Sequence, residues 1–96
     1  MSSQNMTTEE IYGRRTWNLL HSMAAYYPEN PDTEKQKAAR DFLEGFMSEG
    51  IEYPEWGEHF LHRMNNENPL DLTDRESFSV WVCKQHNLFN IDFKKP

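Results

Sequence analysis

Apolar residues recur at helical spacing in four separate segments of this chain, and this periodicity constrains the fold more than any other feature. The first segment shows it most clearly, with four residues at positions i, i+3, i+4 and i+7 of one helix face: Trp17, Leu20, His21 and Ala24. No segment shows a convincing alternation of apolar and polar residues, which is typical of a half-buried strand. The pattern therefore predicts an all-α protein.

Capping signals place the ends of the helices. The spacing Thr7-x-x-Glu10 predicts a capping box, in which each residue's side chain bonds the backbone of the other, at the start of the first helix. Thr73-x-x-Glu76 predicts a second capping box at the start of the last helix. Pro54 suits the first turn of the third helix. The expected helices span roughly residues 7–26, 32–48, 54–66 and 73–90.

The expected helices form a four-helix bundle with one core. At 96 residues the chain makes one domain, which we assign to residues 9–96 after a flexible segment over 1–8. The residues expected to point inward from the last three helices are Ala38, Ala39, Phe42, Phe46, Phe60, Leu61, Met64, Phe78, Trp81, Val82 and Phe89.

Charge and composition exclude several classes of function. The net charge of −6 argues against nucleic acid or an anionic membrane as the main partner. No apolar run approaches the roughly 20 residues of a membrane-spanning helix. Residues 1–8 lack the features of a secretory signal and of an Arg-rich transit peptide. The single cysteine, Cys83, cannot form an internal disulfide or a thiolate metal cluster.

One face of the expected last helix carries a polar stripe. Its members fall at i, i+3, i+4 and i+7: Cys83, His86, Asn87 and Asn90. Buried amide and imidazole groups need hydrogen-bond partners, so the stripe either faces solvent or meets a flat polar partner. Trp17 and His21, one turn apart on the first helix, form a counterpart.

Other constellations carry less chemistry. His59 and His62, beside Glu58, have the spacing of two metal ligands on a helix, but no third ligand stands at a clear spacing. We therefore interpret both histidines as solvated surface residues. The chain contains no Gly-rich phosphate loop and no arguable Ser-His-Asp arrangement.

Several blocks together resemble the Erv/ALR family of FAD-dependent sulfhydryl oxidases. The resemblance extends from Gly13 to Pro96, and its specific part combines G-R-x-x-W-x-x-L-H from Gly13 with W-x-C-x-x-H-N-x-x-N from Trp81. Further matches are the runs AAYYP over 24–28, YP over 53–54 and KP over 95–96.

The resemblance implies a four-helix bundle with a short fifth helix, which binds FAD at one end. It places Trp17 and His21 beside the isoalloxazine and adenine rings, and Tyr53 near the flavin. The implied contacts also include Gly13, Arg14, Arg15 and Thr16 in the N-terminal block, Cys83, His86, Asn87 and Asn90 on the adenosine and ribose side, and Lys95 near the phosphates.

The chain departs from the family at its redox centre. The family motif reads Y-P-C-x-x-C-x-x-x-F, whereas this chain reads Y-P-E-W-G-E-H-F from Tyr53 to Phe60, so both cysteines are absent as deletions. Removing two helical residues would rotate the rest of that helix by roughly 200°, unless the long segment 47–52 absorbs the change. The family also pairs the cysteine matching Cys83 with one beyond the Lys-Pro end, which this chain lacks.

These features predict a degenerate family member that acts as a structural or assembly subunit. The resemblance suggests the mitochondrial intermembrane space, with secretory and viral branches as alternatives, and a homodimer or larger complex. One rival is a flavin-linked thiol oxidase, passing electrons through FAD to oxygen or cytochrome c, whose cysteines are altered or missing from this sequence. Another is a small helical binding protein without flavin.

Overall fold

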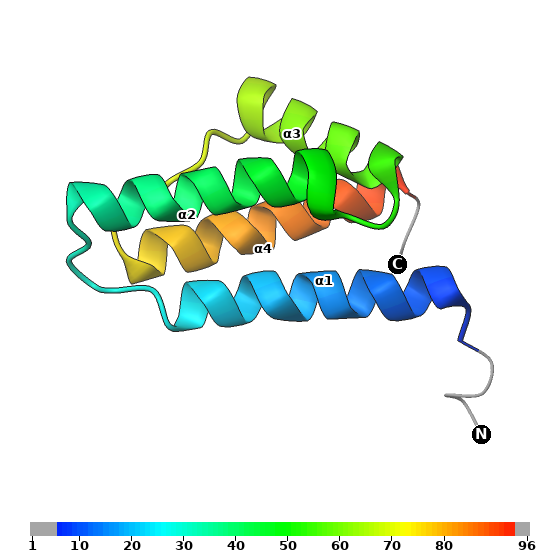
Figure 1. The fold of residues 1–96 in the computed structure, drawn as a ribbon, viewed down its shortest axis with the longest axis horizontal. Coiled ribbons are helices and arrows are strands. Elements are labelled where there is room, and N and C mark those ends of the chain that lie inside the picture. Colours follow the sequence, from blue (N-terminus) through cyan, green and yellow to red (C-terminus); the bar gives the residue numbers. More distant parts are fainter. Residues whose placement is uncertain (1–5, 94–96) are drawn as a thin grey trace.

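The computed structural model describes residues 6–93, which fold into a helical bundle (Figure 1). The four helices are α1 (Thr8–Ala25), α2 (Thr33–Gly45), α3 (Pro54–Asn66) and α4 (Arg75–Asp92), and a π-helical segment, η2 (Phe46–Gly50), continues α2. The predicted all-α four-helix bundle is confirmed. Within residues 6–93 there is no strand and no fifth α-helix.

The capping box at the start of α1 forms as predicted. The Thr7 hydroxyl accepts a hydrogen bond from the Glu10 backbone N–H at 3.1 Å, and the Glu10 carboxylate accepts one from the Thr7 N–H at 3.4 Å. Because Thr7 caps the helix and Thr8 begins it, the boundary drawn between residues 8 and 9 falls too late, and both threonines belong to the helical domain.

The second predicted capping box is wrong by one residue. α4 is capped by Asp74, whose carboxylate accepts a hydrogen bond from the Ser77 N–H at 2.7 Å, while the Thr73 N–H donates to Asp71 at 3.1 Å. A carboxylate also interacts favourably with the positive end of the helix dipole. The hydrogen bond from the Ser77 backbone lowers the pKa of Asp74.

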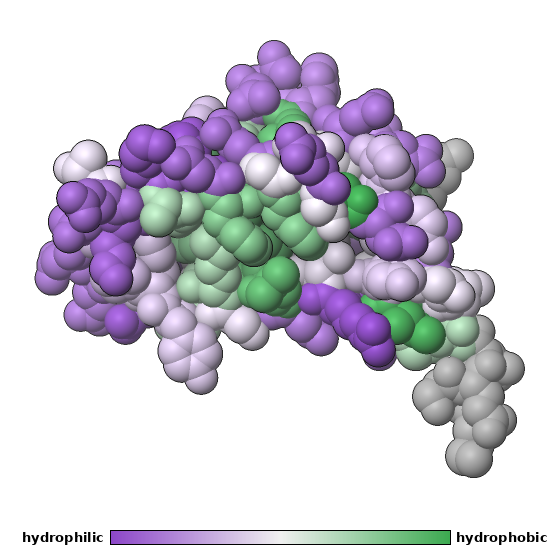
Figure 2. All heavy atoms as spheres, viewed as in Figure 1, coloured by the Kyte–Doolittle hydropathy of each residue, from purple (hydrophilic) through white to green (hydrophobic). Residues whose placement is uncertain are grey.

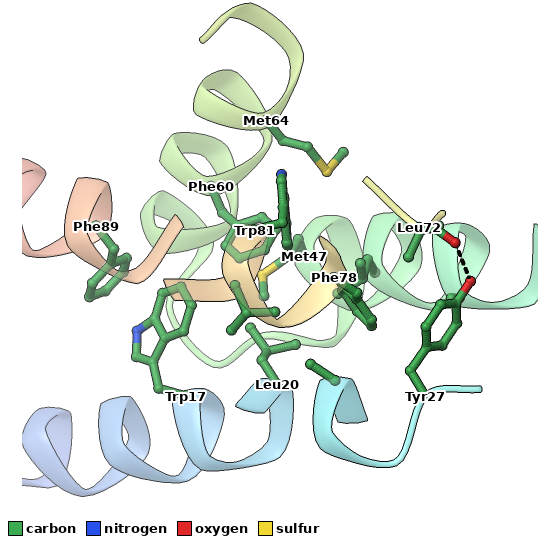
Figure 3. Close-up of a cluster of buried hydrophobic side chains, with 14 of the residues drawn as sticks. Trp17, Leu20, Tyr27, Met47, Phe60, Met64, Leu72, Phe78, Trp81 and Phe89 are labelled. Carbon is green, nitrogen blue, oxygen red and sulfur yellow. Dashed lines mark hydrogen bonds between the residues drawn. The ribbon is translucent and has the colours of Figure 1, made fainter. Parts of the chain in front are cut away.

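The core is a continuous cluster in which aromatic rings link three helices (Figure 3). α1 packs mainly against α4, and α3 packs against both α4 and η2. The fully buried members with the largest side chains are Phe78, Leu20, Leu43, Gln85 and Val82. The inward residues predicted for α4 (Phe78, Trp81, Val82 and Phe89) are all buried, as are Phe60 and Met64 of α3, whereas Leu61 is half-buried.

The predicted inward face of α2 is partly wrong. The buried series is Ala39, Leu43 and Met47, whereas Ala38 is exposed and Phe42 is 43% exposed. A shift of one position turns a helix face by about 100°, so the series i, i+4, i+8 from Ala39 leaves its neighbours outside. Phe42 instead stacks on the half-buried Phe46, with ring centroids 5.7 Å apart.

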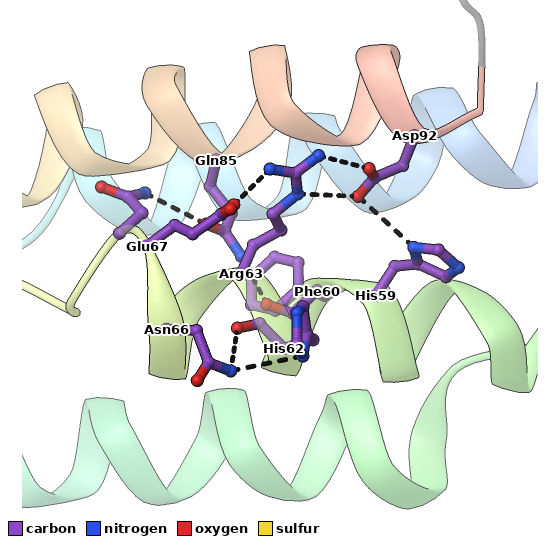
Figure 4. Close-up of polar contacts among 9 residues, drawn as sticks. His59, Phe60, His62, Arg63, Asn66, Glu67, Gln85 and Asp92 are labelled. Carbon is purple, nitrogen blue, oxygen red and sulfur yellow. Dashed lines mark hydrogen bonds and ion pairs between the residues drawn. The ribbon is translucent and has the colours of Figure 1, made fainter.

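Buried polar bonds fix α3 and the following loop to α4. Gln85, 1% exposed, donates to the Phe60 carbonyl at 2.7 Å and accepts from the Asn68 amide at 3.0 Å. At the C-terminal end of α4, the Arg63 guanidinium donates to both carboxylate oxygens of Asp92, at 2.5 and 3.1 Å (Figure 4). This guanidinium lowers the pKa of Asp92. None of these pairs was anticipated from the sequence.

The first turn of α3 sits very close to η2. A Cβ built on the buried Gly57 would lie 1.8 Å from the Met47 carbonyl oxygen, which is closer than any side-chain atom can approach. Phe60 and Met64, further along α3, still point into the core. The connection through η2 and residues 51–53 thus positions α3 so that both side chains are buried.

We expect Gly57→Ala to destabilise the fold by about 3 kcal/mol or more, because the methyl group would force α3 away from η2. The matched control is Gly45→Ala, where a Cβ meets nothing within 4 Å. That change should instead stabilise the helix by roughly 0.5–1 kcal/mol. Urea unfolding followed by circular dichroism measures both, and equal stabilities for the two variants would refute the proposed close contact.

Candidate functional site

A cleft of about 590 Å³ lies along the α1–α4 contact and reaches the first turn of α3. It is lined by residues from these three helices: Glu9, Glu10, Gly13, Arg14, Trp17, Asn18, His21, Trp56, His86, Phe89 and Asn90. This volume lies in the range of pockets for small molecules and cofactors. The α1 residues among them recur every three or four positions, so one face of that helix forms a whole wall.

Two histidines and a tryptophan form one end of the cleft. The His86 imidazole stacks on the Trp17 indole, with centroids 4.3 Å apart and planes 7° apart. His21 Nε2 lies 3.2 Å from His86 Nδ1, so one imidazole can donate to the other when both are neutral. Burial of the imidazole is the main cause that lowers the pKa of His86, and the nearby His21 lowers it further. The site therefore favours the neutral form of the His86 imidazole.

The other end combines aromatic rings with the carboxylates of Glu9 and Glu10, in the first turn of α1. Trp56, which is 3% exposed, meets Phe89 edge-to-face with ring centroids 5.4 Å apart. The ring centroid of Tyr53 lies 4.5 Å from that of Trp56. The indole also covers Gly13 of α1, where a built Cβ would lie 3.6 Å from its ring. α3 thus inserts a large rigid ring between α1 and α4 and closes this end.

The structure brings six of the twelve predicted site residues together in the cleft wall: Gly13, Arg14, Trp17, His21, His86 and Asn90. Five others lie outside the wall. Arg15, Cys83 and Asn87 are exposed, whereas Thr16 and Tyr53 are half-buried. Lys95 lies outside the described residues.

The polar stripe of α4 therefore divides into two. His86 and Asn90, one turn apart, face α1 and the cleft, while Cys83 and Asn87, also one turn apart, are exposed. A stripe that includes positions i, i+3, i+4 and i+7 is wider than the contact with one neighbouring helix, because i and i+3 diverge by about 60°. Cys83 and Asn87 therefore lie outside the cleft wall, and their contact with a ligand stays a prediction.

Sequence reasoning missed several lining residues. Asn18 stands three positions before His21, so helical spacing alone could have placed it on the cleft wall. Phe89 was assigned only to the core, although it belongs to the cleft wall as well. The helical spacing of apolar residues does not indicate that Trp56 lines the cleft, because its position depends on how α3 enters the bundle. Glu9 and Glu10, in the first turn of α1, were also missed.

The remaining histidine pair does not form a cluster of ligands. His59 Nδ1 lies 3.4 Å from an Asp92 oxygen, and His62 is exposed beside Asn66 (Figure 4). Across residues 6–93, no three His, Cys, Asp or Glu side chains gather in a way that could hold a metal ion. None of the helices in that range has both the length and the apolar character needed to cross a bilayer.

A sequence model of the Erv1/Alr family matches residues 14–96. The chain belongs to this family. The match contains both halves of the cleft, since it covers the α1 wall from Arg14 and all of α3 and α4.

Relatives with similar sequences support this family membership. The FAD-linked sulfhydryl oxidase ERV1 of Oryza sativa is 35% identical over 91 residues, which cover 95% of this chain and 45% of the relative. The mitochondrial FAD-linked sulfhydryl oxidase ERV1 of Saccharomyces cerevisiae is 34% identical over 88 residues, which cover 91% and 45% of the two chains. The chain thus spans about half the length of these curated relatives.

Solved structures show the same fold. The yeast Erv1 core superposes with a TM-score of 0.82 at 31% identity, covering 95% of this chain and 75% of that one. The FAD-binding domain of Saccharomyces cerevisiae Erv1 superposes with a TM-score of 0.80 at 33% identity, covering 95% and 85%. With one cysteine in its sequence, this member of the family lacks the C-x-x-C pair.

We predict that stability falls as the pH drops from 7 to 5, in part because of His86. Its pKa is lowered in the folded state. Protons therefore bind the unfolded chain first, near pH 6.5, and shift the equilibrium toward unfolding until the pH falls below the folded-state pKa. Melting temperatures across this range should show a smaller decline for His86→Phe than for the control His62→Phe. Parallel curves for the two variants would contradict the assignment.

Proposed function

We propose that this chain is an FAD-binding domain that does not turn over dithiols and that acts as a structural or assembly subunit. The observation that carries the proposal is the composition of the cleft. It combines flat aromatic and imidazole rings with one cation, two amides and two carboxylates, Glu9 and Glu10, while Cys83 lies exposed outside it. Half of the residues that the family resemblance implies for FAD thus line the cleft, whereas the redox pair of cysteines is absent.

The lining residues fit FAD. Trp17 and His86 form a flat wall suited to ring stacking. Arg14 is the one Lys or Arg among the lining residues and suits the diphosphate, while Asn18 and Asn90 can hydrogen-bond ribose or ring edges. When bound, the flavin would supply a two-electron acceptor.

The chain offers no dithiol to such an acceptor. Closing a disulfide within one chain requires two cysteines, and Cys83 is the single one. It is exposed, one turn before His86, and does not line the cleft. The rival proposal, a thiol oxidase that uses Cys83 as its donor, therefore lacks a resolving thiol.

We place the protein in mitochondria, in the intermembrane space. Support comes from two relatives named as mitochondrial FAD-linked sulfhydryl oxidases, from Saccharomyces cerevisiae and Schizosaccharomyces pombe, which are 34% and 35% identical to this chain. The protein partners that we infer are a second copy or other subunits of a complex there.

An exposed apolar surface supports a protein partner. Apolar colour gathers between α1 and α2 in the space-filling view (Figure 2). These two helices have few direct contacts with each other. Exposed or half-buried apolar side chains on or directly after these helices include Leu19, Met23, Tyr26, Phe42 and Phe46. An unpaired surface of this kind commonly marks an interface, and we assign it to a homodimer.

The cofactor assignment predicts a yellow protein with about one FAD per chain and no dithiol turnover. We expect purified or FAD-reconstituted protein to show a flavin absorption spectrum, because the cleft retains its stacking and hydrogen-bonding groups. Oxygen uptake with dithiothreitol should not exceed that of free FAD at the same concentration. Turnover well above free FAD that is lost in Cys83→Ser would establish the rival oxidase instead.

The dimer assignment predicts that Phe42→Glu shifts the protein to monomers, because a desolvated carboxylate opposes association across an apolar surface. Ile91→Glu is the matched control, since Ile91 is a similarly exposed apolar residue on α4. Light scattering after gel filtration should give a dimer mass for the wild type and the control. A monomeric wild type would rule out the homodimer.

A further inference from the structure

We propose that the His21–His86 pair binds one proton together with FAD, so that the diphosphate of the cofactor meets a second positive charge and affinity rises as the pH falls. This inference rests on the proposed binding of FAD. It goes further by making that binding dependent on pH and by naming the groups that cause the dependence.

The cleft offers an anionic ligand little positive charge. Its lining contains one guanidinium, Arg14, and two carboxylates, Glu9 and Glu10, which leaves a net charge of −1. Glu10 is engaged with Thr7 in the capping box, and within residues 6–93 neither carboxylate forms an ion pair with Arg14. The doubly charged diphosphate of FAD adds to this negative charge. One guanidinium therefore does not neutralise the ligand.

The charged and polar groups follow one another along one face of α1. Asn18 stands four positions after Arg14 and His21 three positions after Asn18, so Arg14 and His21 lie about 10 Å apart along the helix axis. Glu10 stands one turn before Arg14, on the side away from His21. Repulsion by the carboxylates therefore favours the side of Arg14 that faces His21 for the phosphates. A positive charge on the imidazole pair acts on that side.

Two facing imidazoles can share one added proton. His21 Nε2 and His86 Nδ1 lie 3.2 Å apart. When one ring is an imidazolium, its facing nitrogen donates to the neutral ring in a charge-assisted hydrogen bond. When both rings are imidazolium, both facing nitrogens carry hydrogen and the bond is lost. The pair thus takes up at most one proton near neutral pH, and this proton belongs to the pair rather than to either ring.

The surroundings leave the pair able to take up this proton when an anion binds. Burial, and secondly the nearby His21, hold the pKa of His86 below its usual range, so that its imidazole is neutral at pH 7. Among residues 6–93, the charged side chains of the cleft lining all stand on α1, and Lys84 of α4 is exposed outside it. An anion in the cleft favours the charged form of an imidazole and raises its pKa. Proton uptake is therefore coupled to the binding of FAD, which itself has no group that titrates near pH 7.

The test counts protons by calorimetric titration of the whole chain with FAD at pH 7, in two buffers of different ionisation enthalpy. We expect an uptake of roughly 0.3–1 proton, and a Kd that falls about three- to tenfold from pH 8 to pH 6. The double variant His21→Gln/His86→Gln keeps hydrogen-bonding groups without a titratable ring. It should take up no proton, and its Kd should change less than twofold over that range. His62→Gln, at an exposed histidine outside the cleft, should behave as the wild type.

The carboxylates are the competing acceptors of the proton. Glu9→Gln and Glu10→Gln should each lower the Kd for FAD by about two- to threefold, because each removes one repulsive charge. Both variants should keep the proton uptake of the wild type. Loss of the uptake in either one, with uptake retained in the double histidine variant, would assign the proton to a carboxylate and overturn the role of the pair.

The outcomes separate this inference from the proposed function. If the wild type does not bind FAD, FAD binding itself is wrong and the coupled proton falls with it. If FAD binds without proton uptake and with the same Kd at pH 8 and pH 6, only the role of the imidazole pair is overturned. If the double variant does not fold by circular dichroism, His21→Gln and His86→Gln decide singly. At least one of them must then lose half of the uptake or more, and wild-type uptake in both overturns the proposal.

Discussion

The stacking of Trp17 against three other rings joins the parts of this molecule. Its indole meets His86 at 4.3 Å, Phe89 at 5.5 Å and Phe60 at 5.9 Å, so α1, α3 and α4 converge on one side chain. The same indole forms part of the cleft wall. Core and binding site therefore share atoms, and any ligand that stacks there also stabilises the bundle. Ligand at about 100 times its Kd contributes roughly 2.7 kcal/mol, a large share of the 5–15 kcal/mol typical of a domain.

Without disulfides, buried polar contacts hold the α3–α4 side together. Gln85 forms hydrogen bonds with both the Phe60 carbonyl and Asn68. Arg63 forms an ion pair with Asp92, whose side chain is 11% exposed. Each such group would be costly if left unpaired, so the contacts specify one arrangement of the two helices. On the opposite side, α2 reaches the core through Ala39 and Leu43, and η2 through Met47, and apolar surface stays uncovered. Side-chain contacts thus hold together the helices that surround the cleft, whereas apolar surface stays uncovered between α1 and α2.

The helical period predicted the bundle well and the site only in part. It placed Trp17, His21 and His86 correctly, because each lies on the face that its helix turns toward a neighbour. It failed for Phe42, because one residue along a helix is a turn of about 100° and a broad apolar stripe does not reveal where its centre lies. The position of Trp56 depends on the close contact of Gly57 with Met47, which is a feature of tertiary structure that no local pattern encodes.

Residues of the cleft differ in how much they reveal about a ligand. Trp17 and Phe89 are needed by the core, so their presence follows from the fold whether or not a cofactor binds. Arg14 is exposed and Asn90 half-buried, and neither belongs to the hydrophobic core. A helical bundle that served only as a scaffold would not require a guanidinium or an amide in the wall of a cleft. Because both match the family pattern, these two residues argue for a retained ligand more strongly than the aromatic wall beside them.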